Sequence, residues 1–247
     1  MPQRILIAGA TSAIAQEMAR AYARRGARLY LLGRDPAKLQ ALCVELGASV
    51  AGSHAADLND LDAAEGYVAQ AWAALGGVDV ACIAHGLLGD QLASERDVHQ
   101  AELIIRTNFL SAVALLLPIA NRLEAAGAGA ICVLSSVAGD RGRPRNYTYG
   151  AAKGGLSVYL QGLRTRLHGK GVRVHTIKLG PVDTPMTANH RKHLLFARPD
   201  AVAHRIVRVI ETGQAVTYLP WFWRPILLGV RALPEFLMQR LGFLGGR

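Results

Sequence analysis

Apolar runs of strand length alternate with segments of helical periodicity along this 247-residue chain. Three runs are nearly continuous in apolar residues, at 78–84 (VDVACIA), 131–135 (ICVLS) and 172–179 (VRVHTIKL). Such runs are typical of parallel strands that are buried on both faces. The alternation therefore predicts an α/β protein, a doubly wound parallel sheet of about seven strands with helices on both faces. The length fits one domain over residues 1–247.

The amino terminus has a strand, a tight turn and a helix in succession. The apolar strand Arg4–Gly9 is followed by the turn Ala10–Ala15 and an amphipathic helix. Gly9 lets the backbone turn sharply, and the free N–H groups at the helix start can bind a diphosphate. This is the context of a Rossmann dinucleotide loop, with alanines replacing two glycines (G-x-x-x-A-x-A), and a plain strand–helix turn is the alternative. The predicted cofactor contacts are Gly9, Thr11, Ser12, Ala13 and Ile14.

The end of the second strand, Arg28–Gly33, indicates which dinucleotide is bound. NAD sites of this kind place an acidic residue there, which hydrogen-bonds a ribose hydroxyl. This chain has Arg34 instead, and an arginine binds a 2′-phosphate that a carboxylate would repel. We therefore predict NADP(H) as the cofactor. Asp35 is then the N-cap of a helix that has Pro36 at its first position and Gly47 at its end.

The third strand ends at Ala56-Asp57-Leu58. The carboxylate of Asp57 can accept a hydrogen bond from the amino group of adenine. A cap or turn role for Asp57 is the alternative. We predict that Asp57 and Leu58 both contact the cofactor.

Ser136, Tyr149 and Lys153 lie within one short stretch, SSVAGDRGRPRNYTYGAAKGG. Tyr149 and Lys153 are four residues apart and share one face of a helix. Ser136 ends an apolar strand, at the sheet edge where ligands bind in open α/β folds. An adjacent ammonium favours the phenolate and lowers the tyrosine pKa. The three side chains can therefore hold a carbonyl oxygen and exchange a proton with it, and an exposed helical pair is the alternative.

Together these residues resemble the short-chain dehydrogenase/reductase family over residues 3 to 219. The resemblance implies hydride transfer between a nicotinamide and a carbonyl or alcohol carbon. Tyr149 would protonate the alkoxide, Lys153 would lower the tyrosine pKa and bind the nicotinamide ribose, and Ser136 would orient the carbonyl. Asn108, in RTNFLSA, matches the family's fourth catalytic residue, which holds a water in the proton relay.

The segment after the fourth strand departs from the family pattern. Family members carry Asn-Asn-Ala-Gly, whereas Ile83-Ala84-His85-Gly86 keeps only the glycine. We interpret His85 as a loop histidine with a structural hydrogen bond near the cofactor and not as a catalytic base. The resemblance places further cofactor contacts at Ala84, His85, Gly86, Pro181, Val182 and Thr184.

Residues 135–167 and the later VDTPMT resemble a narrower group, bacterial reductases of a polyprenyl-phosphate-linked 2-keto-ribose. This resemblance implies a hydrophobic or lipid-linked sugar substrate. The helices around 98–126 and 148–168 resemble those that pair subunits in the family, which implies a homodimer or homotetramer. The alternative function is a non-catalytic NADP-binding scaffold or regulatory protein, which has no physical need for Asn108, Ser136, Tyr149 and Lys153.

Basic residues are concentrated near the carboxyl terminus. The net charge is +10, and residues 191–247 contain nine Lys/Arg and three Asp/Glu. The basic apolar tail, 220–247, contains no run of the ~18 apolar residues needed to span a bilayer. It predicts two short helices starting at Pro225 and Pro234, with Arg224, Arg231, Glu235 and Gln239 on one side. The opposite, apolar stripe comprises Ile226, Val230, Leu233, Leu237, Leu241 and Leu244.

Two interpretations of this tail stay open. It lies on the inner face of a membrane as a peripheral contact, or it packs against the protein body or a second subunit. Because residues 191–247 carry +6 of the net charge of +10 and are also the most apolar part of the chain, we expect no nucleic-acid partner. The three cysteines, Cys43, Cys82 and Cys132, show no Cys/His ligand spacing, so we expect reduced thiols, no metal site and a cytoplasmic protein.

Arg141, Arg143 and Arg145 lie between the predicted catalytic serine and tyrosine. In a loop that rims the site they could hold a phosphate or carboxylate of the substrate. The alternative is that Asp140 and Arg141 hold the loop in place while the other two arginines face water.

Overall fold

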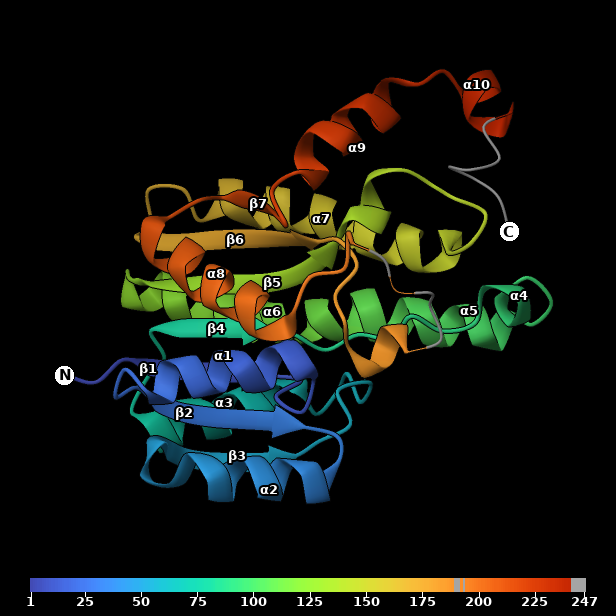
Figure 1. The fold of residues 1–247 in the computed structure, drawn as a ribbon. Coiled ribbons are helices and arrows are strands. Elements are labelled where there is room, and N and C mark those ends of the chain that lie inside the picture. Colours follow the sequence, from blue (N-terminus) through green and yellow to red (C-terminus); the bar gives the residue numbers. More distant parts are fainter. Residues whose placement is uncertain (189–191, 193, 241–247) are drawn as a thin grey trace.

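The computed structural model of the protein describes residues 1–188, 192 and 194–240. Seven parallel strands form one sheet in the order β3-β2-β1-β4-β5-β6-β7 (Figure 1). The chain reverses its direction of winding between β1 and β4, where a crevice opens at the carboxyl ends of the strands. The strands are β1 Arg4–Ala8, β2 Arg28–Gly33, β3 Val50–Ala55, β4 Val80–Ile83, β5 Gly129–Ser136, β6 Val172–Leu179 and β7 Val216–Leu219.

Helices cover both faces of the sheet and bury two separate apolar layers. Met18, Leu39 and Ile206 of α1, α2 and α8 belong to one layer. Val68 and Leu160 of α3 and α7 belong to the other, together with α6. The predicted doubly wound α/β fold is therefore confirmed. The helices are α1 Ala13–Ala23, α2 Pro36–Leu46, α3 Ala64–Leu75, α4 Gln91–Ser94, α5 Val98–Ile105, α6 Ser111–Ala126, α7 Tyr147–Arg166, α8 Pro199–Thr212, α9 Trp223–Ala232 and α10 Glu235–Arg240.

The cap residues place the helix starts at the carboxyl edge of the sheet. The Asp35 side chain accepts a hydrogen bond of 3.0 Å from the backbone N–H of Lys38, and Pro36 is the first residue of α2. Gly47 follows the last residue of that helix, as predicted. Ser12 caps α1 by accepting a bond of 3.3 Å from Ala15 N–H. Both strand–helix turns thus open toward the same edge.

A π-helical turn, Arg106–Leu110, joins α5 and α6. The sequence predicted one long helix around 98–126, whereas the structure has this turn within it, and Asn108 is buried in the turn. Such turns are frequent at functional sites. Among the described residues, the stretch Val98–Ala126 is the one long and apolar enough by composition to cross a membrane, and half of its most apolar window is buried within the protein.

The carboxyl-terminal helices differ from the prediction in their rotation. α9 begins at Trp223, two residues before Pro225, and α10 begins just after Pro234. The buried residues of these helices are Leu227 and Met238, outside the predicted apolar stripe. The side chains of Ile226 and Leu237 in that stripe are exposed, and Leu241 and Leu244 lie outside the described residues.

The rotation of α9 has a specific cause. Trp223 packs so closely against Gly180 that a side chain at position 180 would overlap the indole. This contact turns the side of the helix that carries Trp223, Leu227 and Val230 toward the body, because these residues follow one another at steps of four and three.

Candidate active site

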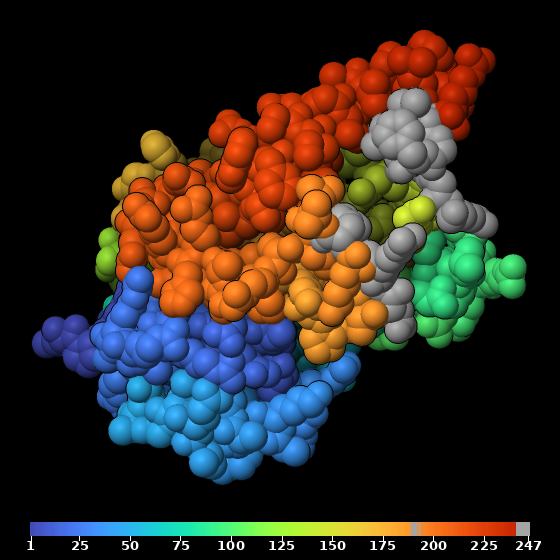
Figure 2. Space-filling model, in the orientation of Figure 1, coloured from blue at the N-terminus to red at the C-terminus, as the bar shows by residue number. Residues whose placement is uncertain are grey.

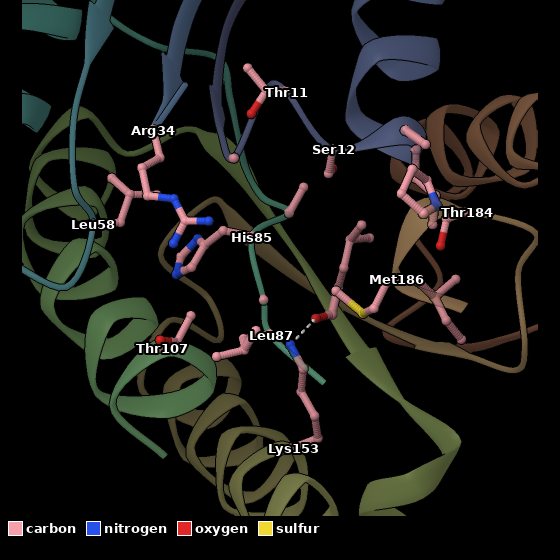
Figure 3. A pocket seen from close by; sticks show the side chains of 18 of the residues that line it. Thr11, Ser12, Arg34, Leu58, His85, Leu87, Thr107, Lys153, Thr184 and Met186 are labelled. Atoms are coloured by element: carbon pink, nitrogen blue, oxygen red, sulfur yellow. Dashed lines mark hydrogen bonds between the residues drawn. The ribbon is translucent and has the colours of Figure 1, made fainter. Parts of the chain in front are cut away.

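One cavity of about 410 Å³ lies at the carboxyl edge of the sheet (Figure 3). Arg34 and His85 lie on one side of it, Thr184 and Met186 on another, and Lys153 closes the lower end of the view. Most of the predicted cofactor contacts line this cavity: Gly9, Thr11, Ser12, Ala13, Ile14, Arg34, Asp57, Leu58, Ala84, His85, Gly86, Tyr149, Lys153 and Thr184.

The turn after β1 brings its backbone against the end of β4. Gly9 has φ +83°, a conformation that L side chains rarely adopt. A Cβ at this position would lie 2.5 Å from the backbone nitrogen of His85. The N–H groups of Gly9 and Ala10 both donate to Leu32 C=O, at 2.9 and 2.8 Å. The absence of a side chain at Gly9 therefore lets this turn pack directly against the backbone of His85.

Two cations line the cavity beyond the end of β2. Arg34 was predicted there, and Lys38 was not. Lys38 lies 3.5 Å from the Asp35 carboxylate, at the start of α2. Asp35 itself caps this helix, as predicted. A cation four residues after Arg34 was the sequence signal that could have identified Lys38.

Asp57 lines the same part of the cavity, and one of its carboxyl oxygens also closes a turn. This oxygen accepts a hydrogen bond of 3.0 Å from Asn59 N–H. The turn role and the cavity position therefore coexist, and the adenine contact of Asp57 stays a prediction.

Ser136, Tyr149 and Lys153 meet where β5 and α7 approach each other. Ser136 is the last residue of β5, and its Oγ hydrogen-bonds Tyr149 and accepts a bond of 3.1 Å from Ala138 N–H. The Lys153 ammonium lies 5.9 Å from the centroid of the Tyr149 ring and donates to Leu134 C=O at 3.1 Å. One helical turn and one strand end therefore fix all three side chains.

Burial dominates the proton affinities in this group. Burial raises the pKa of Tyr149 to about 12, and the hydrogen bond with Ser136 opposes this rise. Desolvation of the phenolate therefore sets the net direction, and the lowering of the tyrosine pKa by Lys153 stays a prediction. Burial also lowers the pKa of Lys153 to about 8. At neutral pH Tyr149 is therefore the protonated phenol, the form required of a proton donor.

Asn108 lies behind the cavity wall. Its Nδ2 donates to Leu87 C=O at 2.6 Å and Ile104 C=O at 2.8 Å, and its Oδ1 accepts from Leu87 N–H at 3.1 Å. A Cβ on Gly86 would lie 2.8 Å from Asn108 Oδ1 and 3.4 Å from Lys153 Nζ. Gly86, the residue that the family pattern retains, therefore lets the asparagine and the lysine approach each other.

His85 faces the cavity as a neutral ring. Its Nε2 is 2.7 Å from Ser111 Oγ, which in turn donates to Thr107 C=O at 2.8 Å. Ser111 Oγ therefore accepts from His85, which places the proton on Nε2. Burial and the charge of Lys153 lower the pKa of His85 to about 3. The structural hydrogen bond predicted for this histidine is present.

Some predicted residues do not line the cavity. Ser136 and Asn108 are not in the cavity wall, although their neighbours Tyr149 and Gly86 are. Val182 is buried, and its backbone forms a short β-bridge with Ala197. Sequence reasoning also missed several wall residues, which lie in the last residues of strands, in the segments after them, or in the turn between α5 and α6. These wall residues are Asn59, Leu87, Thr107, Leu134, Ser135, Leu179, Pro185 and Met186, in addition to Lys38. Pro181 is also absent from the wall.

The arginine loop between Ser136 and Tyr149 is attached to distant segments. Arg141 forms an ion pair of 2.6 Å with Glu235 of α10. Asp140 pairs with the buried Lys178 of β6 and accepts a bond of 2.7 Å from the Tyr218 hydroxyl. Asp140 and Arg141 therefore hold the loop in place, each with its own partner.

Arg143 and Arg145 differ in burial. Arg143 is half-buried, and burial together with the charge of Arg145 lowers the pKa of its guanidinium, whereas Arg145 is exposed. Neither side chain lines the cavity, so their contact with substrate stays a prediction.

Comparison with known proteins agrees with this geometry. A model of the short chain dehydrogenase family matches residues 3–195. An uncharacterized oxidoreductase of Mycobacterium tuberculosis is 36% identical over 240 residues, 96% of each chain. Another, of Streptomyces coelicolor, is 34% identical over 243 residues, 97% of this chain and 96% of its own.

Solved structures show the same fold. A short chain dehydrogenase of Burkholderia cenocepacia in complex with NADP is 21% identical and superposes with a TM-score of 0.83, covering 97% of this chain and 98% of its own. Levodione reductase, also 21% identical, has a TM-score of 0.80 and covers 87% and 95%. With the family model and the relatives, these observations show that the chain is an oxidoreductase of the short-chain dehydrogenase family.

Proposed function

We propose that the protein is an NADPH-dependent reductase of a carbonyl group. The observation that carries this proposal is the half-buried, protonated Tyr149, which shares one cavity with the Gly9 turn and with Arg34. A proton donor in this cavity, next to a serine hydroxyl, matches the needs of carbonyl reduction.

The chemistry divides between the cofactor and the protein. NADPH, when bound, supplies the hydride that adds to the carbonyl carbon. The hydroxyl of Ser136 orients the carbonyl oxygen, and Tyr149 gives that oxygen its phenolic proton, so that a secondary alcohol forms. Lys153 places a positive charge beside the phenolate that remains, which stabilises it until it is reprotonated. Asn108 fixes the backbone of Leu87 at the same wall.

The residues present fit an NADP(H) molecule. Gly9 and the residues at the amino terminus of α1 line the cavity, where the free N–H groups of the first helical turn can bind a diphosphate. At the end of β2, Arg34 and Lys38 offer two cations to a 2′-phosphate. The Burkholderia structure that shares this fold contains NADP. These features support NADP(H) over NAD(H).

The substrate proposed is hydrophobic or lipid-linked. Leu87, Leu134, Leu179, Pro185 and Met186 give the cavity an apolar wall around the reactive end. A cytoplasmic enzyme with peripheral contact to the inner membrane face would meet such a substrate. We further propose a homodimer or homotetramer, because α5, α6 and α7 present exposed apolar side chains such as Val98, Leu117 and Val158.

Titration of NADPH and NADH into the purified protein, followed by nicotinamide fluorescence, tests the cofactor assignment. We expect NADPH to bind at least about tenfold more tightly than NADH. Arg34→Ala and Lys38→Ala should each weaken NADPH and leave NADH nearly unchanged. Lys170→Ala, at the opposite edge of the sheet, is the matched control. Equal affinities would refute the NADP(H) assignment, and no binding of either would favour a non-catalytic protein.

A further inference from the structure

The last two helices form an arm, residues 221–240, that leaves the body after β7. In the ribbon view α9 and α10 rise away from the sheet and extend over the loop before α7 (Figure 1). In the space-filling view the arm stands above the rest of the molecule as a ridge (Figure 2). Each of its helices buries a single residue, Leu227 in α9 and Met238 in α10.

The inner side of this arm is fixed to the elements that carry the active site. Trp223 packs on Gly180, directly after β6. Arg231 lies close enough to the Tyr218 hydroxyl to oppose the rise in its pKa that burial causes, and that hydroxyl donates to Asp140, four residues after Ser136. Together with the Arg141–Glu235 ion pair, these contacts fix the direction in which the arm faces relative to the site.

The outer side is apolar and cationic at once. Trp221, Leu228 and Phe236 are 70%, 58% and 57% exposed. Arg224 and Leu228 are four residues apart in α9, so these two exposed residues lie on one face of the helix, and the exposed Trp221 lies in the turn just before it. Arg240 lies one turn from Phe236 in the same way. We call these five residues the outer face of the arm.

The charge of the arm decides which partner this face fits. Residues 221–240 contain three arginines and one acidic residue, and that residue, Glu235, is paired with Arg141. A second copy would bring Arg224 and Arg240 against the same cations. An anionic lipid surface complements them, and it accepts indole and aliphatic side chains at its boundary.

We propose that the outer face of the arm binds the surface of an anionic lipid bilayer. Because the inner side is attached to the loop between Ser136 and Tyr149, the bound arm holds this side of the enzyme against the lipid. A substrate with a lipid anchor would then reach the cavity without leaving the membrane. The lipid contact itself does not depend on hydride transfer.

Sedimentation of the full-length protein with phosphatidylcholine vesicles, with and without phosphatidylglycerol, tests the proposal. We expect partitioning onto the anionic vesicles to exceed that onto the neutral ones by about tenfold or more. Arg224→Gln/Arg240→Gln should remove most of this preference. Trp221→Ser/Leu228→Ser/Phe236→Ser should abolish binding to both vesicles. Val44→Ser/Leu92→Ser, which removes exposed apolar side chains elsewhere, is the control and should bind normally.

Two further measurements keep the outcomes distinct. NADPH titration of each variant reports whether the body is folded and should be unchanged, so loss of lipid binding with normal NADPH affinity supports the lipid surface alone. Light scattering after gel filtration reports the oligomer. The proposal would be overturned if the wild-type protein did not bind anionic vesicles. It would also be overturned if the triple-serine variant dissociated into smaller species, which would assign the face to a second copy of the chain.

Discussion

The ammonium of Lys153 lies 5.9 Å from the centroid of the Tyr149 ring, and the lysine side chain is only 4% exposed. The two groups share a helix face, and burial disfavours the charged form of each. The pKa of Tyr149 rises to about 12 and that of Lys153 falls to about 8. The site therefore holds a neutral phenol beside a lysine that loses its proton in mildly alkaline solution.

The buried charge of Lys153 costs stability at neutral pH. Its pKa of about 8 in the folded protein lies below the ordinary value of 10.5, so the unfolded chain binds more protons between these two pH values. The penalty is fully present below pH 8 and disappears as the pH rises toward 10.5. Relative to Lys153→Met, wild type should therefore gain roughly 3 kcal/mol of unfolding free energy between pH 7 and 10.5. Urea denaturation of both proteins across this range measures the difference, and a difference that does not change with pH would contradict it.

The Asp140–Lys178 pair supports the segment that follows Ser136. Both side chains are buried, and the Lys178 ammonium also lies 5.3 Å from the Tyr218 ring centroid. Asp140→Ala leaves the lysine buried without its carboxylate, which should cost about 3–5 kcal/mol of unfolding free energy. Asp140→Leu/Lys178→Met removes both charges and should recover most of that loss. Denaturant titration compares them, and a double variant no more stable than Asp140→Ala would refute the pairing argument.

Alanine substitutions at Gly9 and Gly26 distinguish the cost of backbone strain from the cost of steric overlap. Both have positive φ, +83° and +72°, but a Cβ at Gly26 meets nothing within 4 Å, whereas one at Gly9 overlaps the backbone of His85. Gly26→Ala should cost only about 1 kcal/mol of backbone strain. Gly9→Ala should cost more and should weaken NADPH binding, because the turn must move. Thermal unfolding and NADPH titration of the pair check this, and equal effects on both quantities would be inconsistent with the close approach.

The features predicted correctly from the sequence are those set by neighbouring residues. The strand Arg28–Gly33, the cap Asp35 and the helix end at Gly47 each depend on a few consecutive side chains. The order of apolar runs was enough for the sheet, because parallel strands buried on both faces have a distinctive composition. Arg34 was found in the same way, at a fixed offset from a strand.

The features that were missed depend on residues far apart in the chain. Lys178 of β6 forms an ion pair with Asp140, which follows β5. Trp223 packs on Gly180, although β7 and α8 lie between these two residues in the sequence. The rotation of α9 follows from that second contact, so the periodicity of the tail alone gave the wrong apolar face. The pKa of Tyr149 was missed for a related reason, since burial is a property of the assembled fold.

The role of Tyr149 as the proton donor is tested most directly by comparing two adjacent tyrosines. Tyr147 begins α7 and is exposed, whereas Tyr149 faces the cavity. NADPH oxidation should be measured for Tyr149→Phe and Tyr147→Phe with a ketone that the wild-type protein reduces, alongside NADPH titration of each variant. We predict that Tyr149→Phe loses about 10²–10⁴-fold in kcat with nearly unchanged NADPH affinity, and that Tyr147→Phe keeps most activity. A Tyr149→Phe protein with wild-type turnover would contradict the mechanism.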